Sequence, residues 1–358
     1  MYLKKGRIKT INFFKKVPVK EVVSFTRELA TLNGAGLSLV RSLTSLRDQM
    51  PAGIFHDALS SIVEGVERGD TFSESLGRFP KIFSQLYVNM IRSGEISGNL
   101  EDILKRLALL LEKQQKLVKR VRGAMIYPSF VLGLALIILS LLMIFVIPTF
   151  TEMFEEMGGE LPKPTQFLIN TSQIFKNYWY IIGGVLFGII SSIKYSLKYP
   201  AVKYFTDRLL LNFPVFGQLI SRVTIARFSR TLGTLLNSDV PILSALQIVK
   251  DTTTNSVYAE CIPKIADAVK EGEGLARMLE ETTLFPDLVI KMVGVGEETG
   301  QLSEMLVTIA DNYDEDVDSL VASMSALMEP FLIVFMGLIV GFIVISMFLP
   351  LFNLSDLM

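Results

Sequence analysis

The chain has little of what enzymes and metal sites usually need. Its 358 residues include one cysteine, Cys261, and one histidine, His56. A single cysteine excludes a disulfide within the chain and fits a reducing cytoplasmic compartment. Neither residue has a second histidine or cysteine at the spacing of metal ligands or of a nucleophile and its base, so we expect both to be structural or incidental. The sequence predicts no catalytic residue, no metal and no cofactor, and hence a protein that is not an enzyme.

Motifs for nucleotides and nucleic acids are missing as well. No glycine-rich loop ends in Lys followed by Ser or Thr, which excludes a Walker-type phosphate site. The chain has 35 Lys and Arg against 36 Asp and Glu, a net charge of -1. This balance argues against bulk nucleic-acid binding, and we expect no nucleic-acid partner.

Charge is absent from three long stretches of the sequence. Hydrophobic residues make up 50% of the chain and the mean hydropathy is +0.44, although 20% of the residues are charged. An α-helix needs about 20 apolar residues to cross a membrane, and aromatic residues favour the headgroup interface. We predict transmembrane helices at 123–151, at 177–193, which begins beside Tyr178, Trp179 and Tyr180, and at 330–353.

Basic residues flank the first two predicted spans on the same side. Five Lys or Arg lie between Lys113 and Arg122 and four between Lys194 and Arg208, whereas the loop between the spans carries four Glu. Lys and Arg mark the cytoplasmic side, which predicts a cytoplasmic N-terminus. The acidic run from Asp311 to Asp318 before the third span gives this rule no support. Alternatively, the first basic cluster binds anionic lipid headgroups.

The chain repeats itself at a distance of about 200 residues. Phe25, Arg27, Leu29, Thr31, Leu32 and Leu43 recur 203 positions later as Phe228, Arg230, Leu232, Thr234, Leu235 and Leu246. Met90, Gly94, Glu95, Gly98, Leu100 and Leu104 recur 202 positions later as Met292, Gly296, Glu297, Gly300, Leu302 and Leu306. Pro128 and Pro148 match Pro330 and Pro350 within the apolar runs. The repeat therefore consists of a soluble domain and a membrane anchor, present twice.

The soluble parts have helical spacing. Apolar residues recur at helical intervals, and Asn33–Gly36 and Asn237–Pro241 suit a helix end and turn, with Pro241 in the first turn of the next helix. No run of alternating β-branched residues appears. We predict an all-α polytopic membrane protein with two homologous cytoplasmic helical bundles and three transmembrane helices. The predicted segments are a basic N-terminal segment 1–20, a first helical domain 21–122, the span 123–151, an extracytoplasmic loop 152–176, the span 177–193, linker helices 194–223, a second helical domain 224–329, the span 330–353 and an extracytoplasmic tail 354–358.

The sharpest local motif is Gly94, Glu95, Gly98, Leu100, with its copy Gly296, Glu297, Gly300, Leu302. Two glycines around a Glu predict a tight turn between helices, with a glycine in the left-handed conformation and the carboxylate near the start of the next helix. Alternatively, the carboxylate contacts a partner or a cation. Upstream, Phe79–Pro80 and Phe285–Pro286 are expected to end one helix and begin another.

These repeated residues resemble a known family. The doubled Phe-x-Arg-x-Leu-x-Thr-Leu and Gly-Glu-x-x-Gly-x-Leu patterns, and the link from Asn212 to Gly217 running into Ala226, Arg227 and Phe228, resemble the type II secretion system F family. The resemblance extends from about Lys20 to near the end of the chain. One departure is Ser38, which stands where the second repeat has Pro241. The family contains inner-membrane platform proteins of type II secretion and of type IV pili.

The resemblance implies a non-enzymatic platform in the bacterial inner membrane. Such a platform couples a cytoplasmic hexameric ATPase to the insertion of pilin or pseudopilin subunits into the base of a filament. The implied partners are that ATPase, the pilin or pseudopilin, other inner-membrane assembly proteins, membrane lipid and further copies of the chain. A pilus, a secretion pseudopilus and a DNA-uptake fibre are all compatible with the residues.

Glycines in two of the predicted spans offer faces for helix packing. Gly184 and Gly188, and Gly337 and Gly341, would let another apolar helix approach closely, or would pack within the monomer. The main alternative function is a membrane transporter subunit, which predicts polar residues or broken helices at the bilayer midplane. The three spans hold no Asp, Glu, Lys, Arg or His, the residues that ion and proton pathways usually require.

Overall fold

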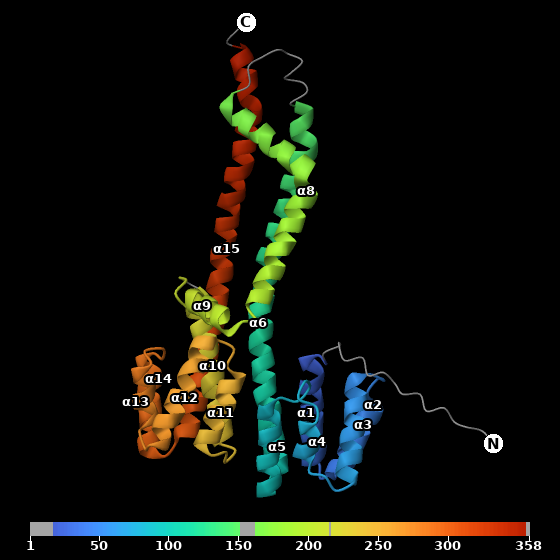
Figure 1. Ribbon diagram of the computed structural model, residues 1–358, viewed down its shortest axis with the longest axis vertical. Coiled ribbons are helices and arrows are strands. Elements are labelled where there is room, and N and C mark those ends of the chain that lie inside the picture. Colours follow the sequence, from blue (N-terminus) through green and yellow to red (C-terminus); the bar gives the residue numbers. More distant parts are fainter. Residues whose placement is uncertain (1–16, 151–161, 215, 356–358) are drawn as a thin grey trace, which may run out of the picture. The chain divides into compact units, whose positions relative to one another are not determined.

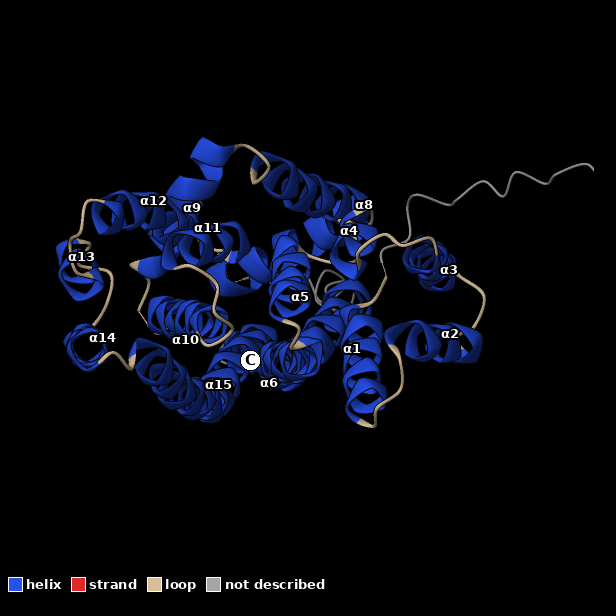
Figure 2. Cartoon of the chain, turned by 90° about the horizontal axis from the view of Figure 1, so that it is seen from below, coloured by secondary structure: helices blue, strands red, loops and turns tan. Residues whose placement is uncertain are grey.

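A computed structural model describes residues 17–150, 162–214 and 216–355 (Figure 1). These residues form helices and loops and contain no strand, which confirms the all-α prediction (Figure 2). The chain divides into two compact units. We call Met1–Lys119 with Ile220–Asp316 the soluble unit, and Arg120–Leu219 with Val317–Met358 the membrane unit.

The soluble unit contains two repeats with the same order of helices. The first repeat comprises α1 (Val19–Gly34), α2 (Leu39–Gln49), α3 (Ile54–Glu67), α4 (Phe72–Gly77), α5 (Gln85–Ser97) and the start of α6 (Leu100–Leu141). The second comprises α10 (Phe216–Leu236), α11 (Ile242–Thr252), α12 (Ser256–Lys270), α13 (Leu275–Glu281), α14 (Asp287–Thr299) and the start of α15 (Leu302–Ser355). In the second repeat, α10 lies between α11 and α15 (Figure 2).

The turn after the first helix of each repeat needs a left-handed residue. Gly36 has φ 83° after α1, and Asp239 has φ 57° at the equivalent position after α10. Glycine adopts this conformation without a steric penalty, and Asp is among the few other residues that tolerate it. Pro241 precedes α11 as its N-terminal cap residue, one position before the predicted place. The duplicated turn is therefore preserved although its residues differ.

Aromatic residues form the same core in both repeats. Phe25 packs on Phe55 with ring centroids 5.5 Å apart, and Phe83 packs on Tyr87 at 4.9 Å. In the second repeat Phe285 packs on Phe228 at 5.1 Å and on Tyr258 at 5.6 Å. Phe285 therefore corresponds to Phe83 and not to Phe79. Pro286, the cap residue of α14, corresponds to Ser84, the cap residue of α5.

The membrane unit contains the long apolar helices. Leu100–Phe150, which includes α6 and the π-helical stretch η1 (Leu142–Val146), and Leu302–Leu349 of α15 are each long and apolar enough to cross a membrane. A further helix, α8 (Lys163–Ser196), bends by 70° between Tyr178 and Gly183. A second bend, of 111°, separates α9 (Pro200–Leu211) from α10. The described chain thus offers two straight candidate spans, or up to four if each bent pair is one span.

The predicted loop at 152–176 is only partly described. Residues 151–161 lie outside the described residues, and α8 already begins at Lys163. Leu168 and Ile169 of α8 are buried in one apolar cluster with Ile147 and with Ile343 of α15. The apolar run between Lys163 and Lys176 is too short to be recognised as a span from its composition, because a span needs about 20 residues. Helix packing therefore extends the second apolar helix well before residue 177.

Candidate functional site

Glu95 and Glu297 each cap the start of a short helix within their own repeat. The carboxylate of Glu95 accepts hydrogen bonds from the backbone N–H groups of Phe72 (2.5 Å) and Ser73 (3.1 Å), in the first turn of α4. Glu297 accepts from Leu275 (2.5 Å) and Ala276 (2.9 Å), in the first turn of α13. The prediction put each carboxylate near the start of the following helix, α6 or α15. It instead satisfies free N–H groups of a helix more than 20 residues earlier, where the helix dipole favours negative charge.

The glycines of this motif have two different functions in the fold. Gly98 and Gly300 end α5 and α14 with φ 70° and 71°, the left-handed turn that the sequence predicts. Gly94 and Gly296 lie inside those helices, where the following helix approaches closely. A Cβ on Gly296 would lie 2.9 Å from Cα of Leu302, and one on Gly94 would lie 3.0 Å from Cγ1 of Ile103. The motif therefore joins three helices of each repeat and has the same geometry in both copies.

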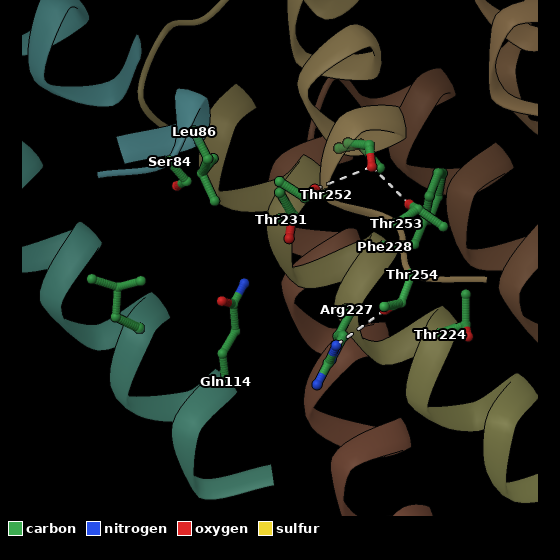
Figure 3. A pocket seen from close by; sticks show the side chains of 12 residues that line it. Ser84, Leu86, Gln114, Thr224, Arg227, Phe228, Thr231, Thr252, Thr253 and Thr254 are labelled. Carbon is green, nitrogen blue, oxygen red and sulfur yellow. Dashed lines mark hydrogen bonds between the residues drawn. The ribbon is translucent and has the colours of Figure 1, made fainter. Parts of the chain in front are cut away.

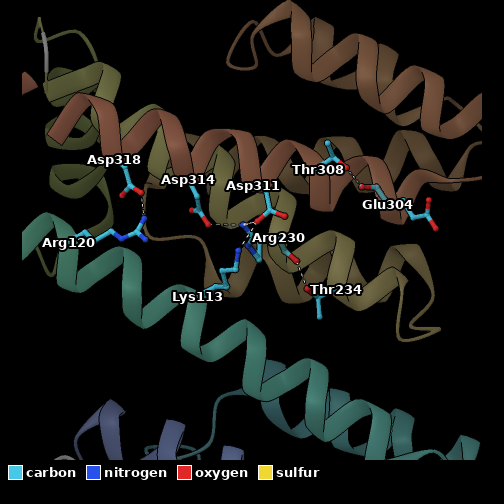
Figure 4. Close-up of polar contacts among 9 residues, drawn as sticks. All are labelled: Lys113, Arg120, Arg230, Thr234, Glu304, Thr308, Asp311, Asp314 and Asp318. Carbon is cyan, nitrogen blue, oxygen red and sulfur yellow. Dashed lines mark hydrogen bonds and ion pairs between the residues drawn. The ribbon is translucent and has the colours of Figure 1, made fainter. Parts of the chain in front are cut away.

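Acidic residues of α15 and basic residues of α6 and α10 form a cluster in the soluble unit (Figure 4). Lys113 of α6 lies 2.9 Å from Asp311. Arg230 of α10 lies 2.9 Å from Asp311 and 2.7 Å from Asp314, and its side chain is only 9% exposed. The acidic run that gave the charge rule no support thus neutralises basic groups of neighbouring helices.

The carboxyl of Asp311 has a pKa below its ordinary value. Desolvation by burial raises this pKa, but the hydrogen bonds and charges of Lys113 and Arg230 lower it by more. Asp311 is therefore held in its ionised form. In the membrane unit, Arg120 of α6 pairs with Asp318 of α15, one heptad after Lys113 and Asp311.

The first repeat has the same ion pair in a weaker form. Arg27 corresponds to Arg230 and Glu112 to Asp314. Arg27 and Glu112 lie 3.5 Å apart with side chains that are 73% and 37% exposed. Exposed pairs of this kind contribute about 0–1 kcal/mol to stability.

A cavity of about 250 Å³ lies where the two repeats meet within the soluble unit (Figure 3). Ser84 and Leu86 of the α5 region and Leu111 and Gln114 of α6 form one wall, and residues of α10, of α11 and of the segment just after α11 form the other. Arg227 donates a hydrogen bond to Thr254 (3.3 Å), and burial lowers the pKa of its guanidinium. The cavity is thus a recess between the repeats that polar and apolar side chains line together.

Direct hydrogen bonds also join the two repeats. The hydroxyl of Ser93 in α5 donates to the carbonyl of Ser238 in the turn after α10, at 2.8 Å. Arg106 of α6 donates to the carbonyl of Asn237 in the same turn. The faces of α5 and α6 in the first repeat therefore contact the first two helices of the second repeat.

The four span glycines leave open space around them. Among the described residues, a Cβ added at Gly184, Gly188, Gly337 or Gly341 would meet no atom within 4 Å. The alternative interpretation, packing of these glycines within the chain, has no contact among the described residues to support it. Their predicted contact with another apolar helix stays a prediction.

Hydroxyl groups connect the helices of the membrane unit. Thr165 of α8 donates to the carbonyl of Ser346 in α15 (2.6 Å), and Ser172 of α8 donates to the carbonyl of Met143 in the π-helical stretch. A π-helical stretch disturbs the regular helix ladder, and side-chain donors can satisfy the carbonyls that it frees. These hydroxyls are thus engaged in helix packing.

Cys261 and His56 belong to the residue types that most often act in catalysis or bind metals, but here their surroundings suggest neither. Cys261 is buried, its thiol donates to the carbonyl of Tyr258, and burial raises its pKa to about 11. His56 lies 3.5 Å from Asp57. Among the described residues, no group of three or more His, Cys, Asp or Glu is placed to hold a metal ion.

The ion cluster is the feature that reasoning from sequence missed. A signal was present, because a basic run precedes one apolar helix and an acidic run precedes the other at a separation of about 200 residues. The positive-inside rule considers Lys and Arg near spans and gives little weight to Asp and Glu. The rule therefore does not predict that the basic run and the acidic run form ion pairs with each other.

Comparison with known proteins identifies both repeats. The family model of type II secretion system (T2SS) protein F matches residues 25–148 and again residues 228–350. Each match begins at the first helix of a repeat and continues into the long apolar helix that follows. The duplication seen in the sequence is therefore a duplication of this family's domain.

Similar proteins cover nearly the whole chain. The type IV pilus assembly protein PilC of Myxococcus xanthus is 41% identical over 97% of this chain and 83% of its own length. PilC of Pseudomonas aeruginosa is 35% identical over 99% of this chain and 94% of its own length. The type II secretion system protein F of Vibrio cholerae is 32% identical over 99% of this chain and 87% of its own length. With two domain matches and relatives of this extent, the chain belongs to the type II secretion system F family.

Proposed function

We propose that the chain is a non-enzymatic inner-membrane platform for assembly of a type IV pilus or a type II secretion pseudopilus. One observation carries this proposal. The family domain occurs twice, and each copy runs from a helical bundle into a long apolar helix. Relatives that match nearly the whole chain are named for pilus assembly and for type II secretion.

The direction of the long helices supports three crossings of the membrane. Arg120 pairs with Asp318 at one end of the membrane unit, and Ile147 shares an apolar cluster with Ile343 further along. In this unit α6 and α15 therefore run in the same direction. Two parallel spans require the chain to return once between them, and α8 is the long apolar helix available for that return.

Thiol labelling tests this topology. With a cytoplasmic N-terminus, Lys163→Cys at the start of α8 should react with an impermeant thiol reagent in intact cells. Ser61→Cys in α3 should react only after lysis, and the native Cys261 provides the background. Labelling of Ser61→Cys in intact cells would contradict the proposed orientation.

The platform role requires partners for the soluble unit and partners for the membrane unit. The soluble unit supplies helical surface for a cytoplasmic hexameric ATPase and other assembly proteins. The open glycine faces of the membrane unit are suited to the apolar helix of a pilin or pseudopilin. Copurification of the tagged chain should recover the ATPase and a pilin, and its deletion should abolish the filament. A deletion strain that still assembles filaments would refute the platform role.

A transporter subunit remains the second function from the sequence. The bend in α8 and the π-helical stretch are the kind of broken helix that a transporter uses. However, Thr165 and Ser172 donate to helix carbonyls, and the family is one of assembly platforms. We therefore favour the platform.

A further inference from the structure

The cavity between the repeats has a counterpart in the first repeat. There, α1, the end of α2 and the start of α3 line an open groove of about 730 Å³. All the residues that the second repeat contributes to the cavity, from Thr224 to Thr254, have their equivalents 203 positions earlier in the wall of this groove, from Glu21 to Pro51. The two repeats thus carry the same groove. In the second repeat, residues of α5 and α6 also line it, whereas in the first repeat all the described lining residues lie before residue 57.

The groove of the second repeat is covered on one side by α5 and α6 of the first repeat. Leu86 of α5 lines the cavity and is 3% exposed. Its equivalent in the second repeat is Leu288 of α14, which is 56% exposed. The face of α14 therefore presents an uncovered apolar side chain at the position where α5 presents a covered one.

The polar contacts between the repeats show the same difference. Ser238, whose carbonyl accepts the hydrogen bond from Ser93, is 3% exposed. The equivalents of these residues are Ala35, which is exposed in the turn after α1, and Val295 of α14, which is 52% exposed. Each repeat thus has two complementary surfaces, a groove and a face that can cover a groove. Within one chain, the covering face of the first repeat contacts the groove of the second repeat, and the other two surfaces stay exposed.

We propose that the two unused surfaces bind each other between copies of the chain. The face of α14 and the start of α15 in one copy covers the open groove of α1 and α2 in the next. This contact repeats the internal one, shifted by one repeat. It joins different surfaces of the two copies, so it is heterologous and extends into a ring or an open row.

The contact between copies is expected to be weaker than the internal contact. Within the chain, Lys113 is held by Asp311. The equivalent residues between copies are Glu315 and Leu109, which cannot form an ion pair. The proposed contact therefore depends on the apolar face around Leu288 and Val295, and a reversible assembly follows.

Cysteine cross-linking of the full-length chain in native membranes tests the proposal, and it requires no assumption about the proposed function. The double variant Ala35→Cys, Val295→Cys should give a ladder of disulfide-linked dimers and larger species under oxidising conditions. Each single variant should remain monomeric. When the two single variants are expressed together with different tags, they should give mixed dimers and nothing larger.

Two controls accompany this experiment. Ser93→Cys, Ser238→Cys places thiols at the internal contact and should give a cross-linked monomer that migrates differently from the reduced chain. Ala35→Cys combined with Ile96→Cys, which is 82% exposed on α5, measures random collision. A ladder from this pair as strong as that from Ala35→Cys, Val295→Cys would refute the proposal.

A second measurement removes the apolar contact without touching the core. Leu288→Asp should weaken self-association of the detergent-purified chain by about tenfold or more, because a buried Leu side chain contributes that much transfer free energy. Its melting temperature should not change, since Leu288 is exposed in the single chain. Disulfide-linked dimers of Val295→Cys alone would overturn the proposal, and so would unchanged self-association of Leu288→Asp. Cross-links from the groove only to the first residues of the same chain would overturn it as well.

Discussion

Arg27 and Arg230 occupy the same position in the two repeats, yet their surroundings differ. Arg27 is 73% exposed and faces a single Glu at 3.5 Å, whereas Arg230 is 9% exposed and is held by two Asp at 2.7 and 2.9 Å. The helix positions are equivalent, so secondary structure is not the cause. The second repeat is covered by α6 of the first, and the first repeat has no such cover among the described residues. Equivalent residues of the two repeats thus contribute differently to the stability of the fold, depending on whether another helix covers them.

Glu95 and Glu297 show the opposite behaviour. Their hydrogen bonds lie inside each repeat and have nearly the same lengths in both copies. Contacts within a repeat are therefore preserved by the duplication, and contacts at its outer faces are not.

The largest predicted effect concerns the two arginines. Arg230→Ala leaves Asp314, which is 16% exposed, without its arginine and leaves Asp311 with Lys113 alone. It should cost about 3–5 kcal/mol, as breaking a buried pair does. Arg27→Ala should cost about 0–1 kcal/mol. Thermal unfolding of the detergent-purified variants measures both. Equal losses of stability in the two variants would show that burial of Arg230 beneath α6 does not contribute to the free energy of unfolding.

The two glutamates should give effects that match each other. Glu95→Gln and Glu297→Gln each replace a carboxylate oxygen by an amide donor that faces a backbone N–H, which should cost about 2 kcal/mol. Unfolding measurements and filament yield should be made on the same variants. A variant with unchanged stability but lost filaments would instead support contact of the carboxylate with a partner.

The two packed glycines should differ modestly. Alanine at Gly296 would meet backbone Cα of Leu302 at 2.9 Å, whereas alanine at Gly94 would meet the equivalent Cα of Leu100 at 3.2 Å and the side chain of Ile103 at 3.0 Å. The closer backbone contact at Gly296 is harder to relieve. Overpacking costs about 1–3 kcal/mol, and the better helix propensity of Ala returns about 1 kcal/mol. We expect Gly296→Ala to lower the melting temperature and Gly94→Ala to lower it less. The reverse order would contradict the geometry.

The smallest effect concerns pH. The pKa of Asp311 in the folded protein lies below its ordinary value of 3.8, so its ion pairs stabilise the fold above that value. This contribution is lost as the pH falls below 3.8 through the lowered pKa of the folded state. Between about pH 5 and about pH 3, the melting temperature of Asp311→Asn should therefore fall less than that of the unmodified chain. Parallel acid curves would show that Asp311 does not contribute to acid sensitivity.

Much of the architecture could be predicted from local patterns. Helical spacing, the left-handed Gly98 and Gly300 and the apolar runs each depend on residues near one another in sequence. The destination of the Glu95 carboxylate could not be predicted, because its partners Phe72 and Ser73 lie more than 20 residues away and offer only backbone N–H groups, which every residue other than proline has. The early start of α8 also escaped prediction, because its first apolar run is too short to resemble a span.

By itself, the sequence determined that this chain is helical, duplicated and equipped with long apolar helices, because periodicity, glycine conformation and hydropathy are local properties of the chain. Only the tertiary structure decided which of two equivalent residues is buried. Leu86 and Leu288, or Arg27 and Arg230, have similar neighbours in sequence, and their exposure differs because one face of each repeat is covered by the other repeat and the equivalent face is not. Burial depends on which surfaces meet in space, and a repeated sequence does not contain that distinction.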